Sequence, residues 1–356
     1  MPTTQLNIVV SQPRIVAGET LHVSVLLDSA DPGTVIQSLT AEVKGVGRTG
    51  WVNIHTDKIF ETEKLYLLNQ FVLCPPGMPI AVGKHQFPLQ VVIPENAPSS
   101  YESQFGTVRY QIKVVLSANT EQASCTEVFP IVVLARSFFD EVPINVLSPI
   151  DFRDEVDFTC CSLPFGCVSL MVSLPRTAFR LGEAVEAEVT VNNRTRKGLK
   201  ECAIQLSMKT QYEAMSRYEH VNEKKLSEHL IELVPLGKVK ARHKQIFAKC
   251  CVRIPEGAPP TQNYHRDGGE TAIIAIHYVL KFIALPERHA TKLRRTKKKI
   301  DTRRSREGIE CEIPLVVTSM GYADSAKHAA FVLHSQRKNS GQQRTVRNIV
   351  EEELTC

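Results

Sequence analysis

The glycine-rich stretch Gly45-Val46-Gly47-Arg48-Thr49-Gly50 has the spacing of a loop that binds the pyrophosphate of a dinucleotide. That chemistry needs the loop to open a helix, because the helix N-terminus holds the phosphates. Here Val52 and Ile54 follow with the alternation of a strand, so we expect a tight turn or a bulge instead of a nucleotide site. The sequence also lacks GxSxG, GxxxxGK[ST] and HExxH. We therefore expect a binding protein that is not an enzyme, with no cofactor and no small-molecule substrate.

The ten cysteines and eleven histidines do not form a metal-binding motif. The strongest alternative is a zinc site made by Cys160, Cys161 and Cys167, joined by Cys250 and Cys251. However, the chain has no CxxC pair, and adjacent cysteines on a strand point to opposite faces. We expect no metal, and buried thiols that behave as small hydrophobes in a reducing compartment. No apolar run approaches the roughly 18–20 residues that span a bilayer, and the N-terminus lacks the pattern of a signal peptide, which predicts a cytoplasmic protein.

A strongly basic segment runs from residue 288 to residue 306, and we expect it to be a hairpin loop between strands ending near Leu285 and beginning near Glu310. It carries +9 whereas the whole chain carries +5, so the rest of the chain carries −4. Three readings are open: a solvated loop without a partner, a nuclear-localisation or RNA-contact segment, and a surface for anionic phospholipids of the inner membrane leaflet. We favour the lipid surface, because each basic residue there is worth about 1 kcal/mol and the segment lacks the aromatic residues that bind nucleic acid. Its basic residues are Arg288, Lys292, Arg294, Arg295, Lys297, Lys298, Lys299, Arg303, Arg304 and Arg306.

Short strand patterns dominate the whole chain and are separated by Gly, Pro and Ser clusters. This rhythm predicts an all-β protein made of two tandem immunoglobulin-like β-sandwiches. Only residues 57–70 and 347–354 fit a helix, and the first of these stretches fits an extended strand equally well. We place the first sandwich at 1–140, a linker at 141–159, the second sandwich at 160–319 and a polar, largely disordered tail at 320–356.

Two sequence markers occur twice. IPENAP begins at Ile93 and returns as IPEGAP at Ile254, and PRIVAGE at Pro13 returns as PRTAFRLGE at Pro175. The first pair is separated by 161 residues and the second by 162. Two markers at nearly the same spacing indicate a duplicated unit of about one domain.

Both halves contain further short elements near these markers. They are Gly83-Lys84-His85-Gln86-Phe87-Pro88, Pro98-Ser99-Ser100-Tyr101-Glu102-Ser103 and Gly106-Thr107-Val108-Arg109-Tyr110 in the first half, and Cys160-Cys161, Gly166, Leu174-Pro175-Arg176 and Gly182-Glu183 in the second. In this combination they resemble the arrestin family, most closely the α-arrestins (arrestin-domain-containing proteins), over about residues 6–319. Ser103 stands where the family has Gly and Leu181 where Pro is common, and both residues fit turns. The resemblance implies structural roles for Pro98, Ser99, Ser100, Gly106, Val108, Arg109, Tyr110, Pro175, Arg176, Gly182 and Glu183.

The resemblance also implies a function. It implies an adaptor that binds cytoplasmic segments of membrane receptors or transporters and steers endocytosis or endosomal transport, in transient contact with the plasma membrane or endosomes. Typical α-arrestins carry PPxY motifs that dock the WW domains of ubiquitin ligases. The pairs Pro75-Pro76 and Pro259-Pro260 are not part of such a motif, so we expect a ligase to be reached only indirectly. The alternative is a signalling scaffold that pairs with another arrestin or with a ubiquitin-ligase adaptor.

Overall fold

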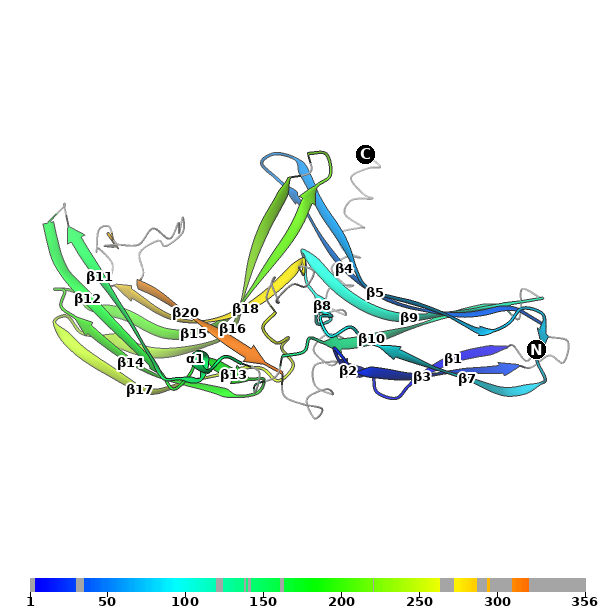
Figure 1. Cartoon of the computed structure of the whole chain (residues 1–356). Helices are drawn as coiled ribbons and strands as arrows, with labels where there is room; N and C mark the ends of the chain where they lie inside the picture. The colour runs from blue at the N-terminus through cyan, green and yellow to red at the C-terminus, as the bar shows by residue number, and fades with distance from the viewer. Residues whose placement is uncertain are drawn as a thin grey trace.

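The computed structural model describes residues 4–29, 35–119 and 124–319, apart from residues 138, 140–141, 161–162, 220, 263–271, 287–292 and 295–308. Figure 1 shows two β-sandwiches side by side, with a pair of hairpins rising between them. The one α-helix of the described part is the short α1 (Ile144–Leu147). The strands are β1 (Gln5–Val10), β2 (Arg14–Val16), β3 (Thr20–Ser29), β4 (Val35–Asn53), β5 (Lys58–Cys74), β6 (Met78–Pro79), β7 (Gly83–Val92), β8 (Tyr101–Glu102), β9 (Gly106–Ala118), β10 (Cys125–Leu134), β11 (Ile150–Cys160), β12 (Leu163–Leu174), β13 (Ala178–Arg180), β14 (Ala184–Asn193), β15 (Leu199–Ser216), β16 (Asn222–Val239), β17 (His243–Arg253), β18 (Ile274–Pro286), β19 (Leu293–Arg294) and β20 (Ile309–Thr318).

The first sandwich places the three-stranded sheet β1-β3-β7 against β5, β4, β9, β10 and β2 of a larger sheet. The sequence of β9 explains this packing. Val108, Tyr110, Ile112 and Val114 are all buried, whereas the residues between them are half-buried or exposed. A strand that alternates in this way buries one face only, as the packing of one sheet on another requires.

The second sandwich repeats the arrangement with the sheet β17-β14-β12-β11-β19 packed against β13, β20, β18, β15 and β16. Val185 and Val191 of β14 lie in the same hydrophobic core as Leu206 of β15 and Phe282 of β18. The strand-rich sequence therefore forms two β-sandwiches, as predicted.

The duplicated markers occupy equivalent places in the two sandwiches. In each sandwich the short strand that lies within the Pro-Arg marker pairs in parallel with the last described strand, β2 with β10 and β13 with β20. The Tyr110 hydroxyl donates to the carbonyl of Pro98 at 2.8 Å, and the Tyr278 hydroxyl donates to the carbonyl of Pro259 at 2.6 Å. The repeat read from the spacing is thus visible in the topology and in two buried hydrogen bonds.

Gly18 and Gly182 make the equivalent turns of the first marker possible. Their φ angles, +94° and +81°, lie in the left-handed region that favours glycine. A Cβ atom on Gly18 would lie 3.3 Å from Cγ of Glu95, and one on Gly182 would lie 2.7 Å from Cγ of Glu256. Each glycine therefore allows both the turn and the close approach of the second marker, which contains that glutamate.

Residues 45–50 lie inside β4, so the alternative of a tight turn is wrong and the alternative of a bulge is confirmed. The register between β4 and β5 shifts between Gly45 and Val46. A Cβ atom would lie 2.4 Å from the Tyr110 ring if placed on Gly45, and 2.6 Å from the Tyr66 ring if placed on Gly47. These glycines make room for tyrosine rings, and the strand continues to Asn53 without a helix that could hold a phosphate.

The stretch expected to be a linker, residues 141–159, contains α1 and most of β11. β11 pairs with β12 from Ile150 to Cys160 and so belongs to the sheet of the second sandwich. Its apolar residues Ile150, Phe152 and Val156 alternate with charged ones, which is a strand pattern that the acidic composition concealed. Residues 58–70, within the stretch that fitted either a helix or a strand, are strand β5.

The basic segment connects two neighbouring strands. β18 and β20 pair antiparallel, as expected for the two sides of a hairpin. Of the segment between them the structure describes only β19, whose Leu293 and Arg294 pair with Phe158 and Asp157 of β11. The other basic residues predicted to bind lipid lie outside the described residues, as does the tail from residue 320 to residue 356 with its candidate helix. No helix in the described part of the chain is long and apolar enough to cross a membrane.

Candidate binding site

Two long hairpins rise from the junction of the sandwiches and pair with each other (Figure 1). Phe60 and Glu61 of β5 lie opposite Ser216 and Met215 of β15 in an antiparallel pairing. We call the described residues of the paired hairpin ends, residues 51–61, 215–219 and 221, the crest. Through the crest the larger sheets of the two sandwiches join into one sheet of twelve strands.

Polar contacts fix the register of the crest. The backbone N–H of Arg217 donates to the carbonyl of Ile59 at 3.1 Å, and its guanidinium Nε lies 2.8 Å from a carboxylate oxygen of Glu61. Nζ of Lys58 lies 2.7 Å from a carboxylate oxygen of Glu219. All four charged side chains are about half exposed. Such ion pairs contribute less than about 1 kcal/mol each, so they guide the pairing more than they stabilise it.

Aromatic side chains at the base of the crest surround a lysine. Trp51 of β4 and Phe60 of β5 stack with ring centroids 5.8 Å apart. Nζ of Lys225, on β16, lies 3.9 Å from the centroid of Phe105 and 5.7 Å from that of Trp51. Phe105 also packs edge-on against Tyr212. A cation over aromatic faces is favourable by about 0.5–2 kcal/mol, so this contact attaches the second sandwich to the first.

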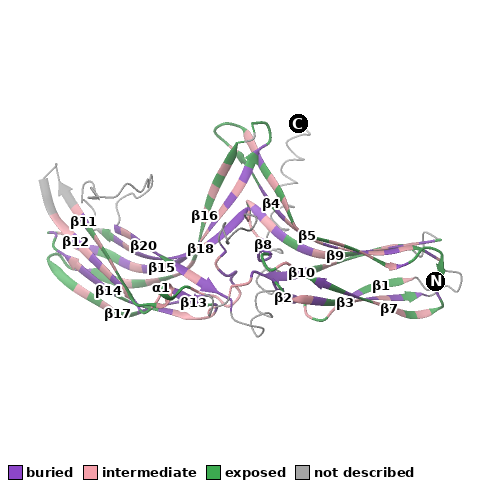
Figure 2. Cartoon of the chain, viewed as in Figure 1, coloured by how far each residue is buried: buried purple, intermediate pink, exposed green. Residues whose placement is uncertain are grey.

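The outer side of the crest exposes large apolar side chains. Ile54 is 82% exposed, Tyr218 74%, Val221 55% and Val52 53%. Figure 2 shows that the two hairpin ends are among the most exposed parts of the molecule. Single exposed apolar residues are ordinary, but several at one protruding point form the kind of surface that contacts another protein or a membrane.

Buried hydrogen bonds connect the two sandwiches below the crest. The Tyr101 hydroxyl lies 3.0 Å from Oγ1 of Thr210 and 3.4 Å from the hydroxyl of Tyr212. The backbone N–H of Ser99 donates to Oε1 of Gln262 at 3.0 Å. Burial, and then the nearby Tyr212, raise the pKa of Tyr101, so its hydroxyl keeps its proton near neutral pH. These bonds hold the base of the crest in one arrangement.

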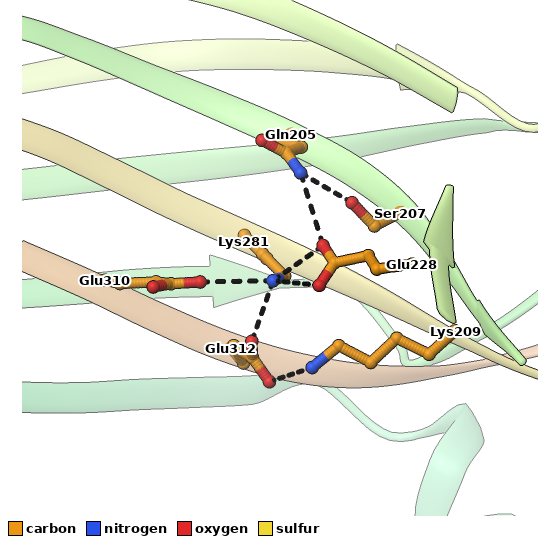
Figure 3. A network of polar contacts seen from close by, with 7 residues as sticks. All are labelled: Gln205, Ser207, Lys209, Glu228, Lys281, Glu310 and Glu312. Carbon is orange, nitrogen blue, oxygen red and sulfur yellow. Dashed lines mark hydrogen bonds and ion pairs between the residues drawn. The ribbon is translucent and has the colours of Figure 1, made fainter. Parts of the chain in front are cut away.

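A charged cluster lies on the outer face of the second sandwich (Figure 3). Nζ of Lys281, on β18, lies 2.7 Å from Glu228 of β16 and 3.1 Å and 2.9 Å from Glu310 and Glu312 of β20. Lys209 of β15 also pairs with Glu312. Burial alone lowers the pKa of Lys281, but its hydrogen bonds to Glu228, Glu312 and Glu310 together outweigh burial and leave that pKa above its usual value. Because β16 pairs with β15 alone among the described strands, the cluster attaches this edge strand to β18 and β20 as well.

The described cysteines are free thiols. Cys250 is buried and its neighbour Cys251 is exposed, as expected for adjacent residues of a strand. Burial raises the pKa of Cys202 to about 11, so this thiol is a poor nucleophile. Within the described ranges, no group of three His, Cys, Asp or Glu side chains could hold a metal ion. Of the proposed zinc ligands, Cys161 and the side chain of Cys160 lie outside the description.

The family-motif residues of the first sandwich support turns and strand ends. The hydroxyls of Ser99 and Ser100, which follow Pro98, accept hydrogen bonds from the backbone N–H groups of Ala135 and Val133 at 2.8 Å and 3.0 Å. They attach the proline-rich turn to the end of the last strand of the sandwich.

Three motif residues next to this turn have different surroundings. Arg109 donates two hydrogen bonds, of 2.6 Å and 2.9 Å, to the carboxylate of Glu102. A Cβ atom on Gly106 would lie 2.9 Å from Cδ1 of Ile274, so this glycine lets the second sandwich approach closely. Val108 is a core residue.

In the second sandwich the motif residues surround one turn. The Arg176 guanidinium donates to the carbonyl of Ala178 at 2.9 Å and pairs with the carboxylate of Glu183. Pro175 is exposed before the turn and Gly182 completes it. The motif residues are therefore spread over both sandwiches and do not line one site.

The sequence motifs do not indicate the crest. Strand length was the signal that could have found it, because β4, β5, β15 and β16 have 19, 17, 18 and 18 residues, against 10 to 13 for β3, β7, β9, β18 and β20. Two neighbouring strands much longer than the rest of their sheet must project beyond the sandwich.

Comparison with known proteins gives two family matches and several relatives. The family described as Arrestin (or S-antigen), N-terminal domain, matches residues 8–135, and that described as Arrestin (or S-antigen), C-terminal domain, matches residues 164–322. Arrestin domain-containing protein 15 of Caenorhabditis elegans is 64% identical over 358 residues, which cover 99% of this chain and 90% of the relative. The human arrestin domain-containing proteins 5 and 1 are 26% and 24% identical over 137 and 171 residues. These alignments cover 38% and 48% of this chain, and 40% and 39% of the two human proteins.

Proposed function

This chain belongs to the arrestin family, and from that membership we infer that it is an adaptor. We propose that it binds cytoplasmic segments of membrane receptors or transporters and steers them into endocytosis or endosomal transport. On this proposal the protein is not an enzyme, and it works in the cytoplasm with transient contact with the plasma membrane or endosomes.

The exposed apolar residues of the crest are the observation that supports this proposal. The crest projects beyond both sandwiches and exposes Ile54, Tyr218, Val221 and Val52 at its end. Val52 lies on β4, and the other three lie in or directly beside the two hairpin turns. The pairing of β5 with β15 and the bond from Arg217 to Ile59 hold these turns in place before a partner arrives, which lowers the ordering cost of binding. A protruding apolar point on a preorganised frame suits contact with a cavity or groove of a membrane protein. Beyond Glu61, β5 pairs only with β4 among the described strands, and this open edge offers backbone groups to an extended segment of the same cargo.

The basic segment at residues 288–306 is a second contact in this proposal. It joins neighbouring strands of the second sandwich, and ten basic residues against one acid favour anionic phospholipids of the inner leaflet. Such a contact would hold the adaptor beside its cargo without a membrane-spanning segment.

The link to ubiquitin ligases is indirect in this proposal, because the sequence contains no PPxY motif. The same observation supports a second candidate function, a signalling scaffold that reaches a ligase by pairing with another arrestin that carries the motif. Co-precipitation of such an arrestin that survives removal of the ligase would favour the scaffold.

Proximity labelling in cells tests the adaptor with a matched pair of variants. Ile54→Asp places a charge on the crest, and Ile144→Asp places the same charge on α1 at an isoleucine that is also 82% exposed. The parent and Ile144→Asp should label plasma-membrane or endosomal proteins, and Ile54→Asp should lose most of that labelling. A catch of soluble nuclear or metabolic proteins only, or equal labelling by both variants, would contradict the proposal.

A further inference from the structure

β16 has one open edge. It pairs only with β15 among the strands that the structure describes. At the hairpin end the N–H of Ser216 donates to the carbonyl of Val221 at 2.8 Å, and antiparallel pairing alternates between hydrogen-bonded and non-hydrogen-bonded pairs. The odd residues from 223 to 229 therefore direct their backbone groups toward β15, and the even residues from 222 to 230 direct theirs outward. An edge of this kind is a template for another strand.

The outward-directed residues form a symmetric pattern. Leu226 is 69% exposed, with Lys224 two positions before it and Glu228 two positions after it. Glu228 is already held by Lys281 at 2.7 Å, and its side chain is still 36% exposed. A lysine and a glutamate placed symmetrically about a leucine are complementary to a second copy of the same strand running in the opposite direction.

The pattern selects one register. With the two-fold axis at Leu226, this leucine faces Leu226 of the second copy, and Lys224 faces Glu228 of the second copy on both sides of the axis. On the opposite face of the strand Glu223 meets His229 of the second copy. An axis at Lys225 would oppose two lysines, and an axis at Glu228 would oppose two glutamates. An axis at Ser227 would place the apolar Leu226 opposite Glu228 and would form no pair of opposite charges between Lys224 and Glu228. Opposite charges and apolar pairs directly across strands are favourable and like charges are not, which favours the axis at Leu226.

We propose that this chain forms a two-fold symmetric dimer through residues 222–230 of β16, with a second copy of itself as the occupant of the edge. Closed two-fold dimers are the commonest soluble oligomers, and this pairing extends the sheet without creating an open chain of subunits. Residue 221 of the crest directly precedes the dimer strand, so the two crests of the dimer lie near each other. An adaptor of this form binds clustered or dimeric cargo by two points at once. The dimer itself does not depend on the proposed function.

Sedimentation of the purified full chain tests the proposal, with two variants that add the same charge to different edges. Leu226→Glu places two carboxylates opposite each other at the axis. Leu68→Glu is the control, because Leu68 is a 46% exposed residue in the part of β5 that pairs only with β4 among the described strands. The parent and Leu68→Glu should dimerise, and Leu226→Glu should raise the dissociation constant by about tenfold or more, with unchanged circular dichroism. A parent that is monomeric up to about 100 μM, or a Leu226→Glu variant that dimerises like the parent, would overturn the proposal.

Crosslinking tests the register separately. Residues that face each other in an antiparallel pair have Cα atoms about 4.5–5.5 Å apart, within the range of a disulfide. Under mild oxidation Leu226→Cys should form a covalent dimer beyond the background of the parent. Leu230→Cys should not, because Leu230 faces Asn222 of the second copy. Equal crosslinking of the two variants would show that the strands do not pair about Leu226.

Discussion

Replacing Lys281 with methionine removes the ammonium group that contacts Glu228, Glu310 and Glu312 (Figure 3). Methionine keeps most of the volume of the lysine, so the main change is the loss of charge. Removing one partner of a buried ion pair costs about 3–5 kcal/mol, because the other partner remains without compensation. The three glutamates are 36–40% exposed, so water partly solvates them and the expected cost falls to about 2–3 kcal/mol.

The pH dependence of this cost has a definite sign. Burial raises the pKa of Glu312, but hydrogen bonds to Lys209 and Lys281 outweigh burial and leave that pKa below its usual value. In the parent, the stability contributed by Glu312 is present above the pKa of the unfolded state and is lost as the pH falls through the folded pKa. In the variant the carboxylates repel each other, so protonation relieves them. The difference in unfolding free energy between parent and variant should therefore shrink between about pH 7 and about pH 4.

Urea unfolding followed by circular dichroism at both pH values measures this difference. Lys209→Met is the matched control, because Lys209 is more exposed (28%) and pairs with Glu312, so its removal should cost less than about 1 kcal/mol. The reasoning is refuted if Lys281→Met unfolds at the same urea concentration as the parent at neutral pH. It is equally refuted if the deficit of the variant grows as the pH is lowered.

Gly45→Ala should destabilise the first sandwich by about 1–3 kcal/mol in urea unfolding, because its Cβ would lie 2.4 Å from the Tyr110 ring. A Cβ atom on Gly50 would have its nearest neighbour, the carbonyl oxygen of Phe60, at 3.4 Å, so Gly50→Ala should change stability by less than about 1 kcal/mol. Equal losses of stability in the two glycine variants would contradict the steric argument. Tyr110→Phe and Tyr278→Phe should each cost about 1–2 kcal/mol, since each leaves a buried proline carbonyl without its hydroxyl donor, and a loss confined to one variant would show that the two positions are not equivalent. Replacing the three lysines at 297–299 with glutamine should weaken binding to phosphoinositide liposomes at low salt by about tenfold or more without lowering the melting temperature, and unchanged binding would exclude the lipid contact.

Local rules explain why much of the fold could be predicted from the sequence. Alternating residues such as Val108 and Tyr110 reveal a half-buried strand wherever they occur, and the repeated prolines and glycines mark equivalent turns without any knowledge of the partner strand. The charged residues of β11 give its stretch the acidic composition of a linker, whereas its apolar residues alternate as in a strand. In that strand the period of the pattern was informative and the composition was misleading.

The crest could not be predicted in the same way. Its pairing joins Phe60 to Ser216, residues more than 150 positions apart, and depends on how the two sandwiches are oriented. Nothing local marks Lys225 as the residue that meets Phe105 and Trp51. Excess strand length indicates that something projects, but only the three-dimensional structure shows that two projections meet.

A single sandwich of this kind would leave its long hairpin poorly supported, because an isolated two-stranded ribbon is marginally stable in water. In the pair, β5 and β15 become the middle strands of a four-stranded ribbon, β16-β15-β5-β4, to which each sandwich contributes two strands. The exposed Ile54 and Tyr218 are thus held by contacts between sandwiches, whereas each core is held by contacts within one. A substitution at the junction, such as the loss of the Lys225 ammonium over Phe105, should therefore weaken binding at the crest while both cores stay folded. Binding and stability are separable at this junction because different contacts determine them.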